Sequence, residues 1–171
     1  MRSFVGIKPQ DVLVMLKLFV RPDLSQKELA DSLYISQAEI SHALKRLKFS
    51  KLLNQNGEVH SAACAEFLVH GLKYVCPADV GQLALGIPTA YAHPDFKFVK
   101  YDPKDIYVWP YAEGKMRGSA LEPFYPSLPK ACLQDKKLYH VASLIEMIRV
   151  GRAREINLAC KEIEKIFSKT A

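Results

Sequence analysis

Apolar residues recur with helical spacing three times in the first fifty residues, around two short polar phrases. Ser25–Glu28 and Ser36–Glu39 both read Ser-x-x-Glu. In such a capping box the serine and glutamate side chains bond the free amides at a helix N-terminus. Apolar positions follow each phrase at intervals of three and four residues. The pattern predicts helices over about 26–33 and 37–48, preceded by a first helix that ends near Pro22.

Only Tyr34 and Ile35 separate the two capped helices, so the chain must turn sharply between them. Two helices joined in this way form a helix-turn-helix unit. Downstream, Asn56-Gly57 is a dipeptide favoured in the two-residue turns of β-hairpins. We therefore expect two short strands within residues 51–61.

The order helix, helix, helix, hairpin resembles the MarR-type and related winged-helix transcription factors of bacteria. The resemblance covers residues 8 to about 70, and its most telling element is "LSQKELADSLYISQAEISHALKRL" followed by "NG". It implies a winged helix-turn-helix domain over residues 1–72, in which the second capped helix enters the major groove of DNA.

The pattern changes in the second part of the chain. A fourth amphipathic helix is expected over 61–75, after which prolines and glycines exclude long helices until about residue 129. Alternating residues predict short strands around turns at 102–103 and 113–114. Two further amphipathic helices, beginning at Asp135 and after Gly151, are expected to form an antiparallel pair.

The predicted fold is therefore α+β and mainly α. An N-terminal winged helix-turn-helix is followed by a proline-rich segment with short strands and by a C-terminal helical pair. Residues 73–171 would form a domain for sensing, dimerisation or partner binding.

If the apolar positions of the second capped helix are buried, its remaining side chains face outwards. Short or neutral residues at its N-terminal end suit base edges and thymine methyl groups, and basic residues at its far end suit phosphates. With the hairpin tip, the predicted DNA-binding set is Ser36, Gln37, Ala38, Ser41, His42, Lys45, Arg46, Lys48, Lys51 and Asn56. The alternative is an ordinary solvated face on a structural helix. The hairpin tip carries no Lys or Arg, so a purely structural role for the hairpin also stays open.

Composition agrees with a protein that has its own core, since 49% of the 171 residues are hydrophobic and 25% are charged. The formal net charge of +6 permits a polyanionic partner. No apolar run approaches the roughly 18 residues that a membrane helix needs. The four cysteines show no Cys-x-x-Cys spacing. We expect a cytoplasmic protein with reduced thiols, located in the bacterial nucleoid and not bound to membranes.

The sequence contains no Gly-rich phosphate loop, nucleophile elbow or metal-binding motif, and its five histidines are spread singly. We expect no enzymatic activity, no catalytic residues, no cofactor and no metal.

The central segments "FLVHGLKYVCPADVGQLALGIPTAYAHP" and "VWPYAEGKMRGSALEPFYPSLPKA", together with "RVGRAREINLA", resemble a little-described family of bacterial helix-turn-helix regulators. Its members are often encoded beside a nucleotidyltransferase-like gene, as in toxin–antitoxin systems. The resemblance implies an alternative function, in which an antitoxin-like protein binds and neutralises a partner enzyme and autoregulates its operon. Arg149, Arg152 and Arg154 are the candidate partner-binding residues, although they could equally cap a helix C-terminus and remain solvated.

The expected function is that of a sequence-specific double-stranded DNA-binding transcriptional regulator, a repressor that acts as a homodimer on an inverted-repeat operator. The dimer interface is expected on the C-terminal helices, at Ile145, Ile148, Ile156, Ile163 and Phe167. Cover of this surface by the proline-rich segment would instead leave a monomer.

Overall fold

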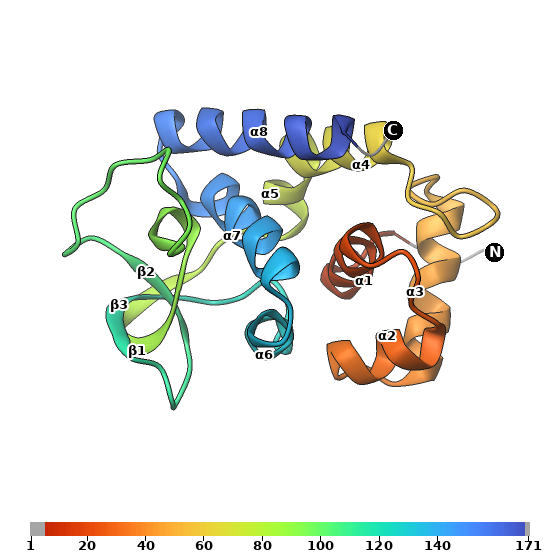
Figure 1. Cartoon of the computed structure of the whole chain (residues 1–171), viewed down its shortest axis with the longest axis horizontal. Coiled ribbons are helices and arrows are strands. Elements are labelled where there is room, and N and C mark those ends of the chain that lie inside the picture. The colour runs from red at the N-terminus through yellow and green to blue at the C-terminus, as the bar shows by residue number, and fades with distance from the viewer. Residues whose placement is uncertain (1–5, 170–171) are drawn as a thin grey trace.

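The computed structural model describes residues 6–169 and shows an α+β protein that is mainly helical, with one three-stranded sheet (Figure 1). The N-terminal helices are α1 (Pro9–Val20), α2 (Gln26–Leu33) and α3 (Gln37–Phe49). They are followed by α4 (Ser61–Glu66), the π-helical turn η1 (Phe67–Gly71), α5 (Leu72–Val75), β1 (Val80–Thr89), the 3₁₀ turn η2 (Ala90–Ala92), β2 (Tyr107–Pro110), β3 (Met116–Leu121), α6 (Leu128–Leu133), α7 (Lys136–Val150) and α8 (Ala153–Ser168).

Helix α1 is the centre of the molecule. All eight residues from Asp11 to Leu18 are buried, because α2 and α3 pack on one side of the helix and α7 packs on the other (Figure 1). At its C-terminal end Phe19 stacks on Phe167 of α8, with ring centroids 3.8 Å apart. One hydrophobic core thus runs through both parts of the chain. The division at residue 72 stays a prediction.

The α2–α3 connection has the expected local structure. Ser25 and Glu28 form both hydrogen bonds of a capping box at α2. Tyr34 ends α2 in the left-handed conformation with φ of 57°, which reverses the chain. The next residue, Ile35, is buried between the helices.

The second capping box forms only in part. Ser36 Oγ accepts from the amide of Glu39 at 3.3 Å, as expected for an N-cap. The Glu39 carboxylate does not return to the Ser36 amide, because it accepts a hydrogen bond from Gln10 of α1 at 3.1 Å.

The hairpin after α3 has a longer loop than predicted. The Asn54 amide donates to the Glu58 carbonyl at 2.9 Å, which leaves a three-residue loop whose last member, Gly57, has φ of 89°. This is the geometry of a turn followed by a left-handed glycine rather than of a two-residue turn. The two expected strands are reduced to a single β-bridge between Leu53 and Val59.

The three strands close on themselves. β1 is antiparallel to both β2 and β3, which pair in parallel with each other. So small a barrel brings backbones into close contact: a Cβ atom at Gly86 would lie 2.0 Å from the Trp109 carbonyl oxygen. The turn at 113–114 was predicted correctly, whereas strand β1 and helix α6 were not expected from the sequence.

The C-terminal helices pack together, and α8 runs back over α7 with its axis oblique to that of α7 (Figure 1). Of the residues expected in a dimer interface, Ile145, Ile148, Ile163 and Phe167 are buried within the single chain. They are therefore not available for a contact between copies in this arrangement, whereas Ile156 is half-buried. The homodimer itself stays a prediction. Within residues 6–169, no helix is long and apolar enough to cross a membrane.

Candidate nucleic-acid interface

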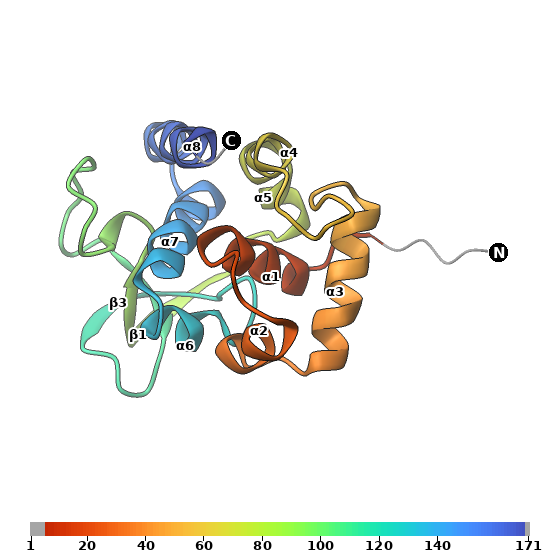
Figure 2. The same cartoon turned by 45° about the vertical axis from the view of Figure 1, so that its right-hand side comes forward.

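Helix α3 lies at one edge of the molecule, as Figure 2 shows. The side chains of Gln37, Ala38, His42 and Lys45 are exposed, and Ser41 is half-buried. On the opposite side Ile40, Ala43 and Leu47 are buried against α1 and α2. The predicted separation of polar and apolar sides is therefore present, with the exception described next.

Arg46 was predicted to face outwards, and this is wrong. Its Nε and Nη2 atoms donate to the two carboxylate oxygens of Asp11 at 2.8 and 2.7 Å. Arg46 is 9% exposed and Asp11 is completely buried. The hydrogen bonds to Asp11 raise the pKa of Arg46. The positive charge of Arg46 is thus paired with Asp11 inside the protein. Arg46 holds α3 against α1 and does not belong to the exposed surface.

The remaining basic residues give a weaker positive surface than the sequence indicated. Lys48 Nζ donates to the Gln55 carbonyl at 3.0 Å and thereby ties α3 to the hairpin. Lys45 and Lys51 are exposed. These three lysines stand against two acidic residues of the same segment, Glu39 and Glu58.

His42 shares the N-terminal half of α3 with one of these acids. His42 Nδ1 lies 3.6 Å from Glu39 Oε1. The Gln10 amide and then His42 lower the pKa of Glu39, which is therefore ionised at neutral pH. A carboxylate here repels phosphate but can accept a hydrogen bond from a cytosine amino group, so this end suits base edges better than the DNA backbone.

The hairpin tip contributes little charge. Asn56 is exposed at the tip, as predicted, and Glu58 accepts a hydrogen bond from Asn54 Nδ2 at 2.6 Å. A minor-groove contact by this hairpin would rest on the Asn56 amide alone.

The three arginines proposed for partner binding do not form one surface. Arg149 was predicted to be available, but its guanidinium donates to the carbonyls of Cys76, Pro77 and Glu122 and to the Glu146 carboxylate. Its side chain is only 3% exposed. Arg152 and Arg154, at the start of α8, are exposed.

The buried group that holds Arg149 was not expected from the sequence. Glu146 is fully buried on α7 and also accepts a hydrogen bond from Trp109 Nε1 at 3.1 Å. Burial raises the pKa of Glu146. Both of its oxygens are occupied by donors of the scaffold, so the group is structural. The only signal in the sequence was the i, i+3 spacing of Glu146 and Arg149.

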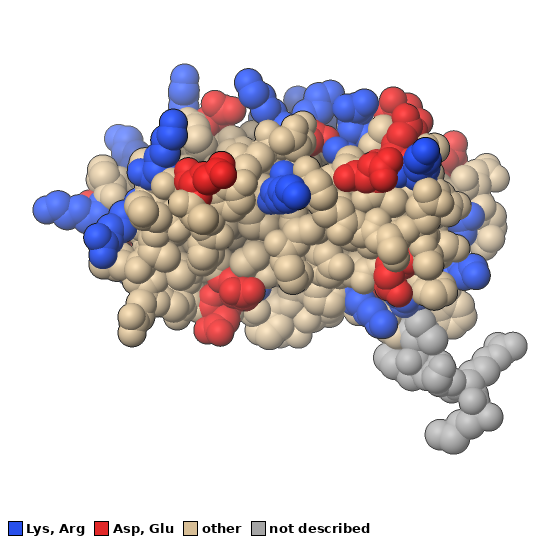
Figure 3. Space-filling model, turned by 90° about the horizontal axis from the view of Figure 1, so that it is seen from below, with Lys and Arg blue, Asp and Glu red and all other residues tan. Residues whose placement is uncertain are grey.

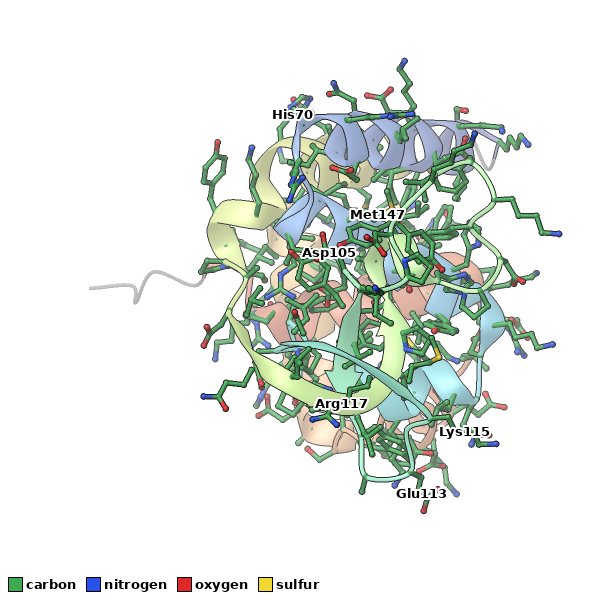
Figure 4. The ribbon with its side chains drawn as sticks, turned by 90° about the vertical axis from the view of Figure 1, so that its left-hand side faces the viewer. His70, Asp105, Glu113, Lys115, Arg117 and Met147 are labelled. Carbon is green, nitrogen blue, oxygen red and sulfur yellow. The ribbon has the colours of Figure 1, made fainter. Side chains whose placement is uncertain are left out.

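The face seen from below and the β2–β3 turn carry mixed charge. On the face in Figure 3, basic and acidic side chains lie near one another, mainly around the edges, and uncharged residues occupy the middle. In Figure 4, Glu113 and Lys115 at the β2–β3 turn have opposite charges, with Arg117 nearby. Within residues 6–169, no three His, Cys, Asp or Glu residues are grouped as for a metal ion.

No protein-family model, curated protein or solved structure matches the chain. The geometry of α3 and its neighbours is therefore the basis on which a function can be proposed.

Proposed function

We propose that this protein is a sequence-specific, double-stranded DNA-binding regulator of transcription, and that α1–α3 and the following hairpin form a winged helix-turn-helix. One observation supports the proposal: one side of α3 is bound to the rest of the fold, and three polar side chains on the other side have no partner among the described residues. Among residues 6–169, no hydrogen bond or ion pair engages the side chains of Gln37, Ser41 and Lys45, whereas Arg46 is held by Asp11.

The exposed side chains of α3 suit the major groove. The Gln37 amide can bond adenine bidentately, the Ser41 hydroxyl and His42 ring can donate or accept, and the Ala38 methyl can contact thymine. Lys45, Lys48 and Lys51 lie further along, where phosphates would neutralise them.

Three lysines and one helix provide modest affinity and read few base pairs. A repressor that acts as a homodimer on an inverted repeat, in the bacterial nucleoid, would double the contact, with half-sites roughly 34–36 Å apart.

The test is the salt dependence of binding to duplexes selected from random DNA. Lys45→Ala/Lys51→Ala should weaken binding to all sequences and reduce the slope of log K against log salt by about 2 for each bound protomer. Lys104→Ala/Lys161→Ala, which removes two exposed lysines elsewhere, is the matched control. Equal effects of the two variants would show that α3 is not the interface.

Base reading is tested separately. Gln37→Ala and Ser41→Ala should each relax preference at one operator position, at a cost of about 1–3 kcal/mol. A uniform loss of affinity for every base at every position would contradict this role.

The antitoxin-like alternative has its own supporting observation. Leu83 and Leu85 of β1 are 63% and 53% exposed, an apolar surface that suits a protein partner, and Arg152 and Arg154 remain available. Co-purification of a nucleotidyltransferase-like protein from the native host would favour this alternative. Arg149 takes no part in it.

A further inference from the structure

A cavity of about 580 Å³ lies between the C-terminal end of α1 and the helices α7 and α8. Its size is within the range of small-molecule sites, which is roughly 300–1,000 Å³. One wall of the cavity is apolar and is formed by Phe19 and Val20 of α1 and Val141 of α7. A molecule inside it would touch both the N-terminal helices and the C-terminal half.

The charged residues of the cavity favour one class of molecule. Lys136 and Lys137, in the first turn of α7, are both exposed, and Asp95 is the acidic residue among those that line the cavity. His140 is half-buried beside them, and burial lowers its pKa, so at neutral pH the ring is an uncharged hydrogen-bonding group. Glu162 of α8 also acts on His140, but its charge is paired with Lys165 at 3.6 Å. Two ammonium groups against one carboxylate favour an anion, and the apolar wall favours a hydrocarbon body.

We propose that this cavity binds a small amphipathic anion, such as a medium-chain carboxylate, and that its occupancy controls the position of the hairpin beside α3. The carboxylate would lie near Lys136 and Lys137, and the chain would lie against Phe19, Val20 and Val141.

The position of the cavity supplies the coupling. Phe19 and Pro22 also line a second cavity of about 310 Å³, whose far wall is the hairpin at residues 56–59. The end of α1 is therefore a shared wall between the proposed ligand site and the hairpin. A ligand that binds one arrangement of Phe19 and Pro22 more tightly than another would shift the population towards that arrangement and, through this shared wall, would move the hairpin.

Binding is tested by titrating the full-length protein with decanoate and following amide NMR shifts. Saturable shifts around Val20 and Val141 are expected, and decyltrimethylammonium, with the opposite charge, should bind much more weakly. Lys136→Glu/Lys137→Glu should weaken decanoate binding about tenfold, while Lys104→Glu/Lys161→Glu, with the same change in net charge, should leave it unchanged. Acidic residues are tolerated at a helix N-terminus, so the cavity variant should fold. Equal binding of the cation and the anion, equal effects of the two variants, or no saturable binding would overturn the proposed site.

Coupling is tested in the same titration without DNA. Shifts that saturate with the same midpoint at Gly57 and Val59 are expected, and unchanged hairpin amides would overturn the coupling. An effect of decanoate on DNA affinity rests on the proposed function and should vanish in Lys136→Glu/Lys137→Glu. If no form of the protein binds DNA, the proposed function fails, whereas the ligand site is still judged by the titration.

Discussion

Helices α3 and α7 each carry an arginine that the sequence placed at the surface, and both guanidinium groups are held inside the protein. Arg46 of α3 meets a single carboxylate, Asp11, at the contact with α1. Arg149 of α7 donates to Glu146 and to three backbone carbonyls from other segments. Neighbours bury eight consecutive residues of α7, whereas α3 keeps a polar side in solvent.

The difference follows from the number of elements around each helix. α7 is contacted by α1, α6, α8 and η2, so its polar groups need partners within the protein. α3 is packed by α1 and α2, and the side facing away from them has no partner to satisfy. Helix α7 is therefore part of the scaffold, and α3 can present side chains to another molecule.

The largest expected effect is on α7. Glu146→Ala should lower the free energy of unfolding by about 3–5 kcal/mol, because it leaves the buried Arg149 charge unpaired. Urea denaturation measures this loss. Glu146→Leu/Arg149→Met, which removes both charges, should be less destabilising than Glu146→Ala. A loss below about 1 kcal/mol for the single variant would mean that Arg149 reaches water, and the contrast with α3 would fail.

Removal of the carboxylate that pairs with Arg46 of α3 should lower the free energy of unfolding by less. Asp11→Ala should lower the free energy of unfolding by about 2–3 kcal/mol, since Arg46 lies near the surface and can be partly rehydrated. A double-mutant cycle with Arg46→Ala measures the coupling energy of the pair. If the two changes are additive, the pair does not hold α3 against α1.

The buried histidine at the N-terminal side of α7 predicts a pH dependence. Burial lowers the pKa of His93 to about 4, below its ordinary value of 6.5. Between those values the unfolded chain binds a proton that the folded protein does not, so stability falls as the pH falls, by about 3 kcal/mol in total. His93→Gln should flatten this part of the profile of unfolding free energy against pH. The exposed His42 is the control, and a flattened profile in His42→Gln alone would contradict the assignment.

The smallest expected effects come from two lysines of α3, one that contacts the hairpin and one that is only exposed. Lys48→Ala removes the hydrogen bond to Gln55 and should lower the unfolding free energy by about 0.5–1 kcal/mol. Lys45→Ala has no such bond to lose and should change it by less than about 0.5 kcal/mol. Thermal unfolding of the two variants side by side measures the difference, and equal destabilisation would show that the Lys48 bond does not stabilise the hairpin.

Much of the N-terminal part could be predicted from the sequence because its signals are local. The serine N-caps of α2 and α3 act on amides three residues away, and the buried Ile35 follows from its place between two amphipathic helices. Helix α3 was therefore located correctly, and so were its exposed residues Gln37, Ala38, His42 and Lys45, whereas Arg46 was not. The proposed role in DNA binding stays a prediction.

Strand β1 and helix α6 had no such local signal. Gly86 and Pro88 lie within β1, and Pro129 is the second residue of α6, so the sequence resembles a loop in both places. Closure of the small barrel makes Gly86 necessary, because the Trp109 carbonyl occupies the space of a side chain. That requirement exists only when the strands have come together.

The sequence by itself determined where the N-terminal helices begin and end, that the protein is α+β and mainly helical, and which residues of α3 are polar. Only the tertiary structure decided where Arg46 and Arg149 point, since their choice depends on partners far along the chain. Asp11 lies 35 residues from Arg46, and the Cys76 carbonyl that accepts from Arg149 lies 73 residues from it. From the sequence alone an arginine is expected at the surface. Once folding brings a buried carboxylate within hydrogen-bonding distance, the free-energy cost of leaving that carboxylate unpaired favours a buried guanidinium.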